Sequence, residues 1–572
     1  MKNLYFLELS DILGENQVYF PYATGMIWSY LKTFKQITDN YKLTDWFFSK
    51  EKSDSIINKI KDPDVIGFSC YIWNWNINNK IAKVIKKKYP KVLIVYGGQH
   101  QPLQDRNKEF FKEHPWVDIL VHGEGENTFK DILLTNLKHR RYFKKIPGCT
   151  IKEKNNERYV TSNRQRIKNL QDYPSPYLDG TFDKLLHSKF NFHAAVESVR
   201  GCPYKCTFCE IGNSYYNKIQ KNYNKTKAEI EWLGKNKIEY ITDCNSNFGL
   251  FFNEDLDIAN TVKKIIKKYR HTMYYRVPWA KGESEKLIPI AKILEECKAQ
   301  KGMTIALQSL NPSTLKAIKR HNMVEDKLKE TINLFEKEGL SSYIELILGL
   351  PEETLNSFKQ NIWKILNFNY HRHLEIHFLS ALPNTPFNDP IYLEKYGIKT
   401  AQVRSLFTHV TPSADEEPEG FEKVVVQTNT MPYTDWLIAV QFRWIILFGH
   451  YLGPMQYVAR FFKKQGIGYQ EFYEHILRYI QKNPKSLLGI ESRKSINCII
   501  DSIENKKPWG RILENISPIT WLHEEASAIT IAINWDKFYV ELKEILNFWD
   551  IDNDILVELL NYQTLRFNIP YR

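Results

Sequence analysis

Three cysteines stand within eight residues of this 572-residue chain, in the string ESVRGCPYKCTFCEIG. Cys202, Cys206 and Cys209 can supply three thiolates to one site, because the glycine and proline beside the first cysteine favour a tight loop. A [4Fe–4S] cluster takes a ligand on each iron, so three thiolates leave one iron open to bind a small molecule. The spacing predicts catalytic cluster ligands, with the Phe208 ring between two of them and beside the cofactor.

Two other interpretations of the cysteines are open. A zinc site needs a fourth ligand, which Cys244 or a histidine would have to supply, and zinc motifs usually come as paired Cys-x-x-Cys units. The thiols can also be buried and unligated. We favour the iron–sulfur interpretation because three clustered cysteines fit it without a further ligand.

The rest of the chain predicts a cytoplasmic protein. The other five cysteines are scattered and suggest no disulfide framework, which fits a reducing compartment. No signal peptide is visible in MKNLYFLELS, which is typical of a first strand. The most apolar stretch, residues 436–453, is interrupted by Gln441, Arg443 and His450, so we expect a buried helix with no membrane insertion.

The chain is basic, with a formal net charge of +13 at pH 7. Such a balance can favour nucleic acid, an acidic peptide or a phosphorylated substrate. The basic residues are spread along lysine-rich helical segments such as KVIKKKYPK, however, and we favour solvated helix faces. Nucleic acid as a partner is therefore weakly supported.

The cysteine string resembles the signature of the radical S-adenosylmethionine (SAM) enzymes. The resemblance implies that the open iron chelates the amino and carboxylate groups of SAM, and that electron transfer from the cluster cleaves SAM to a 5′-deoxyadenosyl radical. It also implies a low-potential electron donor such as a flavodoxin or ferredoxin.

Residues 1–150 alternate between strand and helix patterns. Apolar runs at 3–9, 64–70 and 92–97 alternate with helical patterns at 25–36, 53–61 and 77–89. This alternation predicts an α/β, doubly wound, Rossmann-like parallel sheet. Ligands of such sheets bind at the carboxyl ends of the strands.

Three distinctive loops stand at those ends. We expect them to contact a bulky planar ligand, since glycines let the backbone approach it closely. The candidate contacts are Tyr71, Ile72, Trp73 and Asn74, then Gly97, Gly98, Gln99 and His100, then Gly123, Glu124 and Gly125. A helix follows the last loop, and Thr128 is expected to cap it. Three such loops in this order, ahead of the cysteine string, resemble the cobalamin-binding module of many radical SAM enzymes.

One departure from that module concerns the lower face of the cobalt. Cobalamin proteins that use a histidine as lower ligand carry an Asp-x-His-x-x-Gly loop, whereas the loop after the first strand here is SDILGENQ. A histidine ligand is therefore not predicted, and residues 71–75 would cover the lower face. Ordinary core packing of Tyr71, Trp73 and Trp75 is the alternative.

Three further segments follow. Residues 151–190 are expected to be a linker with a hairpin-like piece and a proline-rich strap. Residues 191–400 resemble the partial (β/α)6 barrel of the radical SAM fold, with strands near 193–199, 238–243, 273–277, 303–309, 343–348 and 375–380. Residues 401–572 predict a mostly α-helical C-terminal domain that can form a substrate cap. No internal repeat is visible.

The resemblance also implies SAM contacts at the strand ends. Asp243 and Asn245 stand where the family binds the SAM amino group, although a helix cap is the alternative for Asp243. Arg276, or else Lys281, can pair with the SAM carboxylate, or form a structural ion pair. The remaining contacts are Gln308 and Ser309 near the ribose and Leu350 at the adenine, and Asn384 stands where glycine is usual.

The predicted function is that of a cobalamin-dependent radical SAM methyltransferase, acting on an unactivated carbon through methylcobalamin and the 5′-deoxyadenosyl radical. The alternative is a cyclase, rearranging or redox enzyme with the same cofactors, and a non-catalytic cobalamin and iron–sulfur sensor is a third possibility. The substrate, whether a small molecule, a nucleotide or a peptide, is not identified. Conceivable contacts in the C-terminal region, each also explicable as core or surface, are Tyr433, Trp436, His450, His523, Glu524 and Glu525.

Overall fold

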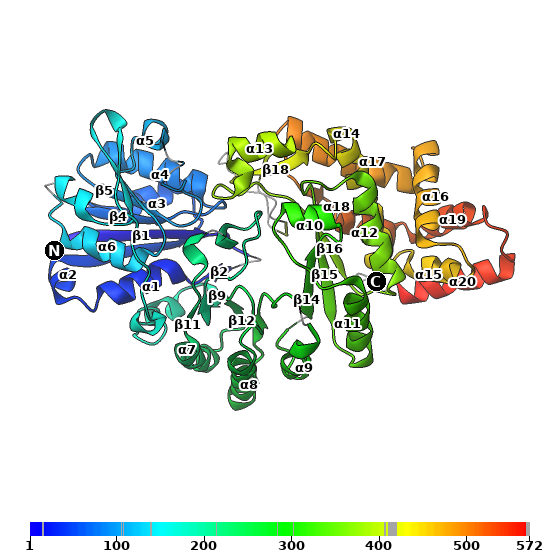
Figure 1. Ribbon diagram of the computed structural model, residues 1–572, viewed down its shortest axis with the longest axis horizontal. Coiled ribbons are helices and arrows are strands. Elements are labelled where there is room, and N and C mark those ends of the chain that lie inside the picture. Colours follow the sequence, from blue (N-terminus) through cyan, green and yellow to red (C-terminus); the bar gives the residue numbers. More distant parts are fainter. Residues whose placement is uncertain are drawn as a thin grey trace. The chain divides into compact units, whose positions relative to one another are not determined.

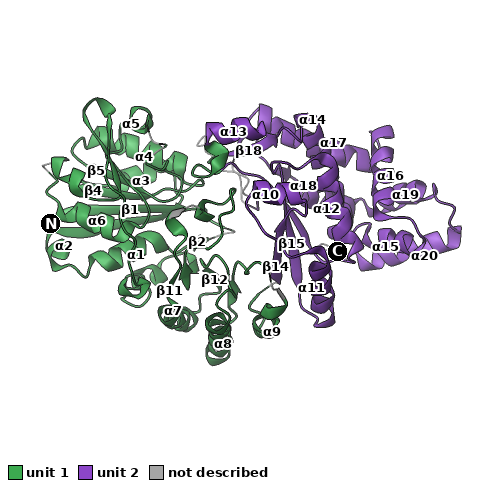
Figure 2. Cartoon of the chain, viewed as in Figure 1, with its two compact units in different colours: residues 1–301, 382–388, 413–421 green, residues 302–381, 389–412, 422–572 purple. Residues whose placement is uncertain are grey.

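The computed structural model describes residues 1–13, 16–104, 106, 108–137, 140–212, 214–282, 284–300, 302–404, 408–409 and 420–567. Residues 14 and 15, in the loop after the first strand, lie outside this part. The chain forms two compact units (Figure 2). Unit 1 comprises residues 1–301, 382–388 and 413–421, and unit 2 comprises residues 302–381, 389–412 and 422–572.

A seven-stranded sheet begins unit 1 (Figure 1), in the order β3-β1-β4-β5-β6-β7-β8. Its strands are β1 (Lys2–Ser10), β3 (Tyr41–Ser49), β4 (Val65–Ser69), β5 (Leu93–Gly97), β6 (Ile119–Val121), β7 (Cys149–Lys152) and β8 (Arg158–Val160). The pairs from β3 to β6 are parallel. Every residue of the central strand β4 is buried, because helices cover both faces of such a sheet. The Rossmann-like prediction is confirmed.

The helices of this sheet are α1 (Tyr22–Leu31), α2 (Lys35–Asn40), α3 (Ser53–Lys59), α4 (Trp75–Lys88), α5 (Phe110–Glu113) and α6 (Gly125–Leu134). Strand β1 shows how the sequence forms two cores, because alternate residues point to opposite faces. Tyr5 and Leu7 join one buried cluster, whereas Leu4 and Phe6 join the other.

Two local expectations in this region need comment. The expected cap at Thr128 is wrong, because α6 begins three residues earlier and Glu124 occupies its N-cap position. The expected hairpin forms, as β7 and β8, but β7 also pairs antiparallel with β6 and so extends the sheet. The domain boundaries expected from the sequence stay a prediction.

A second sheet of unit 1, in the order β13-β12-β9-β2, is parallel throughout. It consists of β2 (Gln17–Tyr19), β9 (Asn191–Val196), β12 (Tyr240–Asp243) and β13 (Tyr274–Arg276), with helices α7 (Tyr223–Lys235), α8 (Phe252–Tyr269) and α9 (Ile288–Glu296). The short strand β2 was not expected from the sequence. The three cysteines of the string lie between the small paired strands β10 (Val199–Arg200) and β11 (Gln220–Lys221).

Unit 2 holds the other three predicted barrel strands. They are β14 (Met303–Gln308), β15 (Ser342–Leu348) and β16 (Leu374–Phe378), all parallel, with helices α10 (Pro312–Ala317), α11 (Glu325–Lys337) and α12 (Leu355–Asn367). Thr354 and Ser357 form a capping box that starts α12. The six predicted strands are thus all present, three in each unit.

The rest of unit 2 is mainly helical, as predicted. Two short strand pairs, β17 (Lys399–Arg404) with β18 (Phe421–Gln427) and β19 (Arg511–Leu513) with β20 (Ser517–Trp521), accompany the helices. The helices are α13 (Pro390–Tyr396), α14 (Tyr433–Ile445), α15 (Gln456–Lys464), α16 (Tyr469–Lys482), α17 (Leu487–Glu504), α18 (His523–Ile533), α19 (Trp535–Leu546) and α20 (Asn553–Arg566).

The apolar stretch at 436–453 forms α14 and a π-helical turn (Ile446–Tyr451), and most of it is buried. Arg443 is accommodated there because Glu524 accepts two hydrogen bonds from its guanidinium, at 3.0 and 2.9 Å. Within the described part of the chain, no helix is both long and apolar enough to cross a membrane.

Candidate functional site

A cavity of about 890 Å³ lies in unit 1 at the carboxyl ends of β4, β5 and β6. This is the edge at which parallel sheets bind ligands. Seven predicted contacts line it, namely Tyr71, Gly97, Gly98, Gln99, Gly123, Glu124 and Gly125. The cavity therefore unites parts of all three loops, at a size suited to a large cofactor.

Glycines shape the cavity wall by leaving the backbone bare. A Cβ atom at Gly97 would meet nothing within 4 Å, so this residue leaves open space. Gly98 has a φ of +101° and packs so closely that a Cβ atom would lie 2.5 Å from the carbonyl oxygen of Cys70. Gly123 has a φ of +71° and lies against the Tyr215 ring. The wall fits a planar ligand that approaches the backbone.

Four predicted contacts do not line the cavity. Asn74 is fully buried, and its amide donates to the carbonyl oxygens of Leu9 and Ser69 while its Oδ1 accepts from the Tyr71 backbone N–H. Ile72 and Trp73 lie half-buried outside the wall, and the Trp73 ring stacks on Tyr71 at 4.5 Å. Asn74 and Trp73 therefore brace Tyr71, which does reach the cavity.

His100 is the fourth of these. Its ring lies 4.9 Å from that of Trp75, which packs on the core of the sheet, and burial lowers the pKa of His100 to about 4. The imidazole is thus neutral at pH 7. Trp75 packs against the core of the sheet, which agrees with the alternative interpretation of this residue.

The cavity also contacts the loop that carries the cysteines. Arg200, two residues before Cys202, pairs with Glu197 at 2.8 Å, with Glu126 at 3.2 Å and with Glu124 at 3.5 Å. All four charged residues line the cavity. Arg200 is largely buried, so these charge-assisted bonds form in a region of low dielectric. The sequence analysis missed this network.

The cysteine loop is tight, as predicted. Gly201 has a φ of +111°, and a Cβ atom there would lie 2.7 Å from the carbonyl oxygen of Tyr216. Cys202 and Cys206 are buried, Cys209 and Phe208 are half-buried, and none of these cysteines forms a disulfide. Phe208 lies between two cysteines in the chain but outside the cavity wall.

The separation of the sulfurs distinguishes two kinds of metal site. Within the described residues, the one group of three or more His, Cys, Asp and Glu ligand atoms lying within 4.8 Å of one another does not include these cysteines. Zinc–sulfur bonds of about 2.3 Å would draw the sulfurs to about 3.8 Å from one another. A cluster separates them further, so the geometry favours the cluster over zinc.

Two polar side chains lie at the thiols. Asn247 donates from Nδ2 to Cys202 Sγ at 3.2 Å, and Lys281 donates from Nζ to Cys206 Sγ at 3.4 Å. These sulfurs stand in for cluster thiolates. The buried Oδ1 of Asn247 has no hydrogen-bond partner in the described structure, which fits an acceptor awaiting a ligand.

The predicted SAM contact Asp243 is held inside the protein. Its Oδ1 accepts from the backbone N–H groups of Ser198 and Asn245, and its Oδ2 accepts from the hydroxyl of Tyr275 at 2.8 Å. Burial raises its pKa. Asn245 is buried too, and donates to the Ser198 hydroxyl, whereas Arg276 is exposed. These bonds cap no helix, since α8 begins at Phe252 with Phe251 at its N-cap, and the SAM contact of Asp243 stays a prediction.

The other predicted SAM contacts lie in unit 2. Gln308 has a φ of +65°, and its Oε1 is buried without a partner in the described structure. A strained backbone with an unsatisfied group is typical of a binding position. Ser309 is buried and donates to Glu353 Oε1 at 2.6 Å, and burial raises the pKa of Glu353 to about 8. Leu350 is fully buried.

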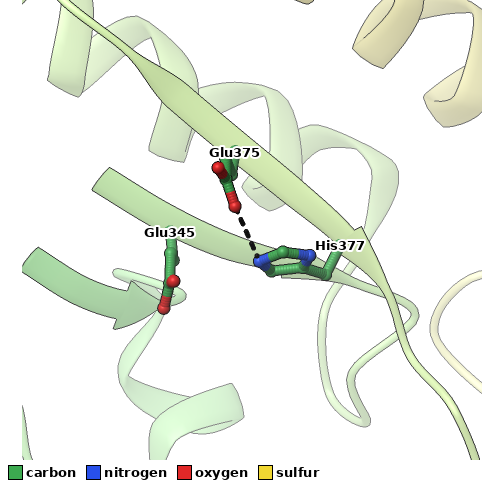
Figure 3. Close-up of side chains that lie close together, drawn as sticks. All are labelled: Glu345, Glu375 and His377. Atoms are coloured by element: carbon green, nitrogen blue, oxygen red, sulfur yellow. Dashed lines mark ion pairs between the residues drawn. The ribbon is translucent and has the colours of Figure 1, made fainter. Parts of the chain in front are cut away.

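One polar group of unit 2 was missed by the sequence analysis. Glu345 on β15 is opposite Glu375 on β16, and with His377 they bring ligand-type atoms within 4.8 Å of one another (Figure 3). His377 Nε2 lies 3.3 Å from Glu375. Alternate residues Ile344 and Ile376 are buried, so the strand alternation in SYIEL and LEIH carried the signal.

Three of the conceivable substrate contacts of the C-terminal region, His450, Glu524 and Glu525, have polar partners of their own. His450 is buried and bonds to His371 at 2.9 Å and to the Tyr473 hydroxyl at 2.8 Å. Glu524 pairs with Arg443, and Glu525 bonds to His409 at 2.7 Å. Trp436 and His523 are buried, and Tyr433 stacks near Trp436. These contacts fit the alternative of core and surface packing.

The fold and the site together define a class of protein. A glycine-walled cavity at the end of a Rossmann-like sheet adjoins a loop of three cysteines that form no disulfide, so a bulky cofactor and an open iron–sulfur cluster can be held in one unit. The family model described as "B12 binding domain" matches residues 28–133, and that described as "Radical SAM superfamily" matches residues 196–362.

Two relatives match nearly the whole chain. The "cobalamin-dependent radical SAM methyltransferase TokK" of Streptomyces tokunonensis is 31% identical, over 96% of this chain and 82% of its own length. The "2-(S-pantetheinyl)-carbapenam-3-carboxylate methyltransferase" of Streptantibioticus cattleyicolor is 28% identical, over 98% of this chain and 84% of its own. The chain belongs to the cobalamin-dependent radical SAM methyltransferases, and its cofactors are cobalamin, a [4Fe–4S] cluster and SAM.

Solved structures show the same fold. OxsB, a "cobalamin-dependent S-adenosylmethionine radical enzyme" with aqua-cobalamin and SAM bound, matches 99% of this chain and 84% of its own, with a TM-score of 0.55 and 14% identity. The radical SAM methyltransferase TsrM from Kitasatospora setae, with cobalamin and a [4Fe–4S] cluster bound, matches 78% of this chain and 91% of its own, with a TM-score of 0.56 and 13% identity.

Proposed function

We propose that this methyltransferase methylates an unactivated carbon of a small molecule. The observation that carries the proposal is the similarity to two methyltransferases across almost the entire chain, C-terminal helices included. The second of these relatives is named for a pantetheinyl carbapenam carboxylate. A small carboxylate, extended by a thioether-linked arm, is accordingly the substrate class that we propose, and the net charge of +13 agrees with an anionic substrate.

Different residues of the chain hold the different cofactors. Cys202, Cys206 and Cys209 hold the cluster. The wall around Gly97 and Gly98 receives the cobalamin ring, with Tyr71 as a side-chain contact. When bound, the cofactors supply a methyl group and a radical that abstracts hydrogen from carbon.

SAM needs contacts of its own. Within unit 1, Lys281, already at the thiols, is better placed than the exposed Arg276 to meet the SAM carboxylate. A low-potential flavodoxin or ferredoxin in a reducing cytoplasm would supply the electron. An oxygen-sensitive cluster requires such a compartment.

The test is anaerobic reconstitution with iron, sulfide and cobalamin, followed by SAM with a deuterated methyl group and a strong reductant. 2-(S-pantetheinyl)-carbapenam-3-carboxylate is the first substrate to offer, and free pantetheine is its control. We expect deoxyadenosine, S-adenosylhomocysteine and a deuteromethylated product by mass spectrometry. Deoxyadenosine without methylation of either cobalamin or substrate would contradict the proposal and favour a rearranging or redox enzyme.

The matched variant is Cys206→Ala. It removes one cluster ligand and should abolish SAM cleavage, whereas Cys297→Ala, which changes the half-buried cysteine that follows α9, should not. If a Cys206→Ala protein kept an intact cluster and cleaved SAM, the three cysteines would not be the cluster ligands that the reaction needs.

A further inference from the structure

The segment 382–388 follows β16 in the chain but belongs to unit 1. Its residue Asn384 is fully engaged with the loop after β5. The side-chain Oδ1 accepts from the Leu103 backbone N–H at 3.0 Å, while Nδ2 donates to the carbonyl oxygens of Gln99 at 2.6 Å and Gln101 at 3.0 Å. Both amide hydrogens are therefore used.

The same residue reaches the cysteine loop. Its backbone N–H donates to Glu210 Oε1 at 3.3 Å, and Glu210 directly follows Cys209. Burial raises the pKa of Glu210 to about 7. Asn384, Glu210 and Gln99 all line the cavity. A continuous path of hydrogen bonds thus runs from the β5 side of the cavity wall, through Asn384, to the residue beside a cluster ligand.

Resting on the proposed function, we propose that Asn384 is a positioning residue that fixes the β5 loop, and with it the cobalamin, against the cysteine loop. A residue without a side-chain amide could not make these three bonds. Methyl transfer needs the two cofactors at a set separation, and a displacement of about 1 Å can cost about a hundredfold in rate.

The segment has other anchors, which separates positioning from folding. Arg106 Nη1 donates to the Thr385 carbonyl oxygen at 2.7 Å, and Asn388 donates to the Leu382 carbonyl oxygen at 2.7 Å. Removal of the Asn384 amide should therefore leave the segment docked but release the β5 loop. Asn388→Ala is a matched control, since this bond stays within the segment.

The experiment compares Asn384→Ala and Asn384→Asp with wild type and with Asn388→Ala. Asn384→Asp keeps an acceptor for Leu103 but sets a carboxylate against two carbonyl oxygens. In each reconstituted holoenzyme, pulsed electron paramagnetic resonance measures the magnetic coupling between cob(II)alamin and the reduced cluster. We expect a broadened distribution of coupling in both Asn384 variants and the wild-type distribution in Asn388→Ala.

A second readout is the ratio of methylated product to deoxyadenosine. In both Asn384 variants this ratio should fall by about tenfold to a hundredfold, because SAM cleavage is affected less than methyl transfer. Wild-type coupling in Asn384→Ala would overturn the proposal, as would loss of bound cobalamin from both variants, which would make Asn384 a binding residue. If wild type forms no methylated product, the proposed function fails, and the coupling still tests Asn384.

Discussion

Arg200 Nη2 donates at 3.2 Å to Glu126 Oε1, and so joins the cysteine loop to the helix that follows the third cavity loop. The same guanidinium makes two further bonds to Glu197, both at 2.8 Å. Since both carboxylates are buried or nearly so, each depends on Arg200 for its compensating charge.

Arg200→Met should therefore destabilise unit 1. Removal of one partner of a buried ion pair leaves unpaired charge and costs about 3–5 kcal/mol in the free energy of unfolding. Arg200→Lys keeps the charge but not the forked geometry, so its free energy of unfolding should lie between those of wild type and Arg200→Met. Urea unfolding of the apoprotein measures this, with Arg493→Met on the exposed face of α17 as control. A urea midpoint of Arg200→Met equal to that of wild type would show that the ion pairs of Arg200 do not stabilise unit 1.

The histidine pair of unit 2, with His450 buried and His371 half-buried, should make stability depend on pH. Burial lowers the pKa of His371 from 6.5 to about 4, and burial together with the nearby His371 and Arg460 lowers that of His450 well below 6.5. The unfolded chain takes up protons below pH 6.5, whereas the folded protein does not until about pH 4. Stability from the pair is therefore fully present above pH 6.5 and is lost as the pH falls towards 4.

Urea unfolding between pH 7.5 and 4.5 measures this loss. Each histidine contributes a slope of up to about 1.4 kcal/mol per pH unit. His450→Gln should reduce the slope, whereas His187→Gln, in an exposed position, should not. Equal slopes in wild type and His450→Gln would show that other groups govern the acid sensitivity.

Asn247 should tune the cluster. A hydrogen bond to a cluster sulfur stabilises the reduced, more negative state, and Asn247 donates to the sulfur of Cys202. Asn247→Ala should therefore shift the reduction potential to a more negative value, and make SAM cleavage more dependent on a strong reductant. A redox titration followed by electron paramagnetic resonance measures the shift, and Asn253→Ala on the exposed side of α8 is the control. A potential equal to that of wild type would show that this contact does not reach the loaded cluster.

The sequence predicted what local patterns determine. Strand–helix alternation and loop glycines identified the sheet and its binding edge, and seven of the eleven expected cobalamin contacts line one cavity. Asn74 and Trp73 follow a cavity residue in sequence but do not line the cavity, because the Asn74 side chain is buried and the Trp73 ring stacks on Tyr71.

Long-range partners could not be predicted in this way. Arg200 and Glu126 are 74 residues apart in the chain, and Asn384 and Gln99 are 285 apart. The Asp243 side chain is held inside the protein by Tyr275 of the neighbouring strand. That contact depends on a strand register that one sequence does not fix. These contacts need the tertiary structure.

Two neighbouring glycines should respond in opposite ways to alanine. At Gly97 a methyl group meets no atom within 4 Å and projects into open space in the cavity wall, so Gly97→Ala should fold normally but bind cobalamin less tightly. At Gly98 the φ of +101° and the Cys70 backbone oppose any side chain, so Gly98→Ala should cost about 1–3 kcal/mol of stability.

The two effects separate in measurements on the same proteins. In urea unfolding of the apoproteins, the free energy of unfolding of Gly97→Ala should equal that of wild type, and that of Gly98→Ala should be lower. Cobalamin affinity of Gly97→Ala, followed by the absorbance of the cofactor, should fall by about tenfold or more, which corresponds to about 1.4 kcal/mol of steric conflict. Wild-type affinity in Gly97→Ala would mean that the cofactor does not approach the backbone there, and would move the cobalamin ring to the Gly123 side of the cavity.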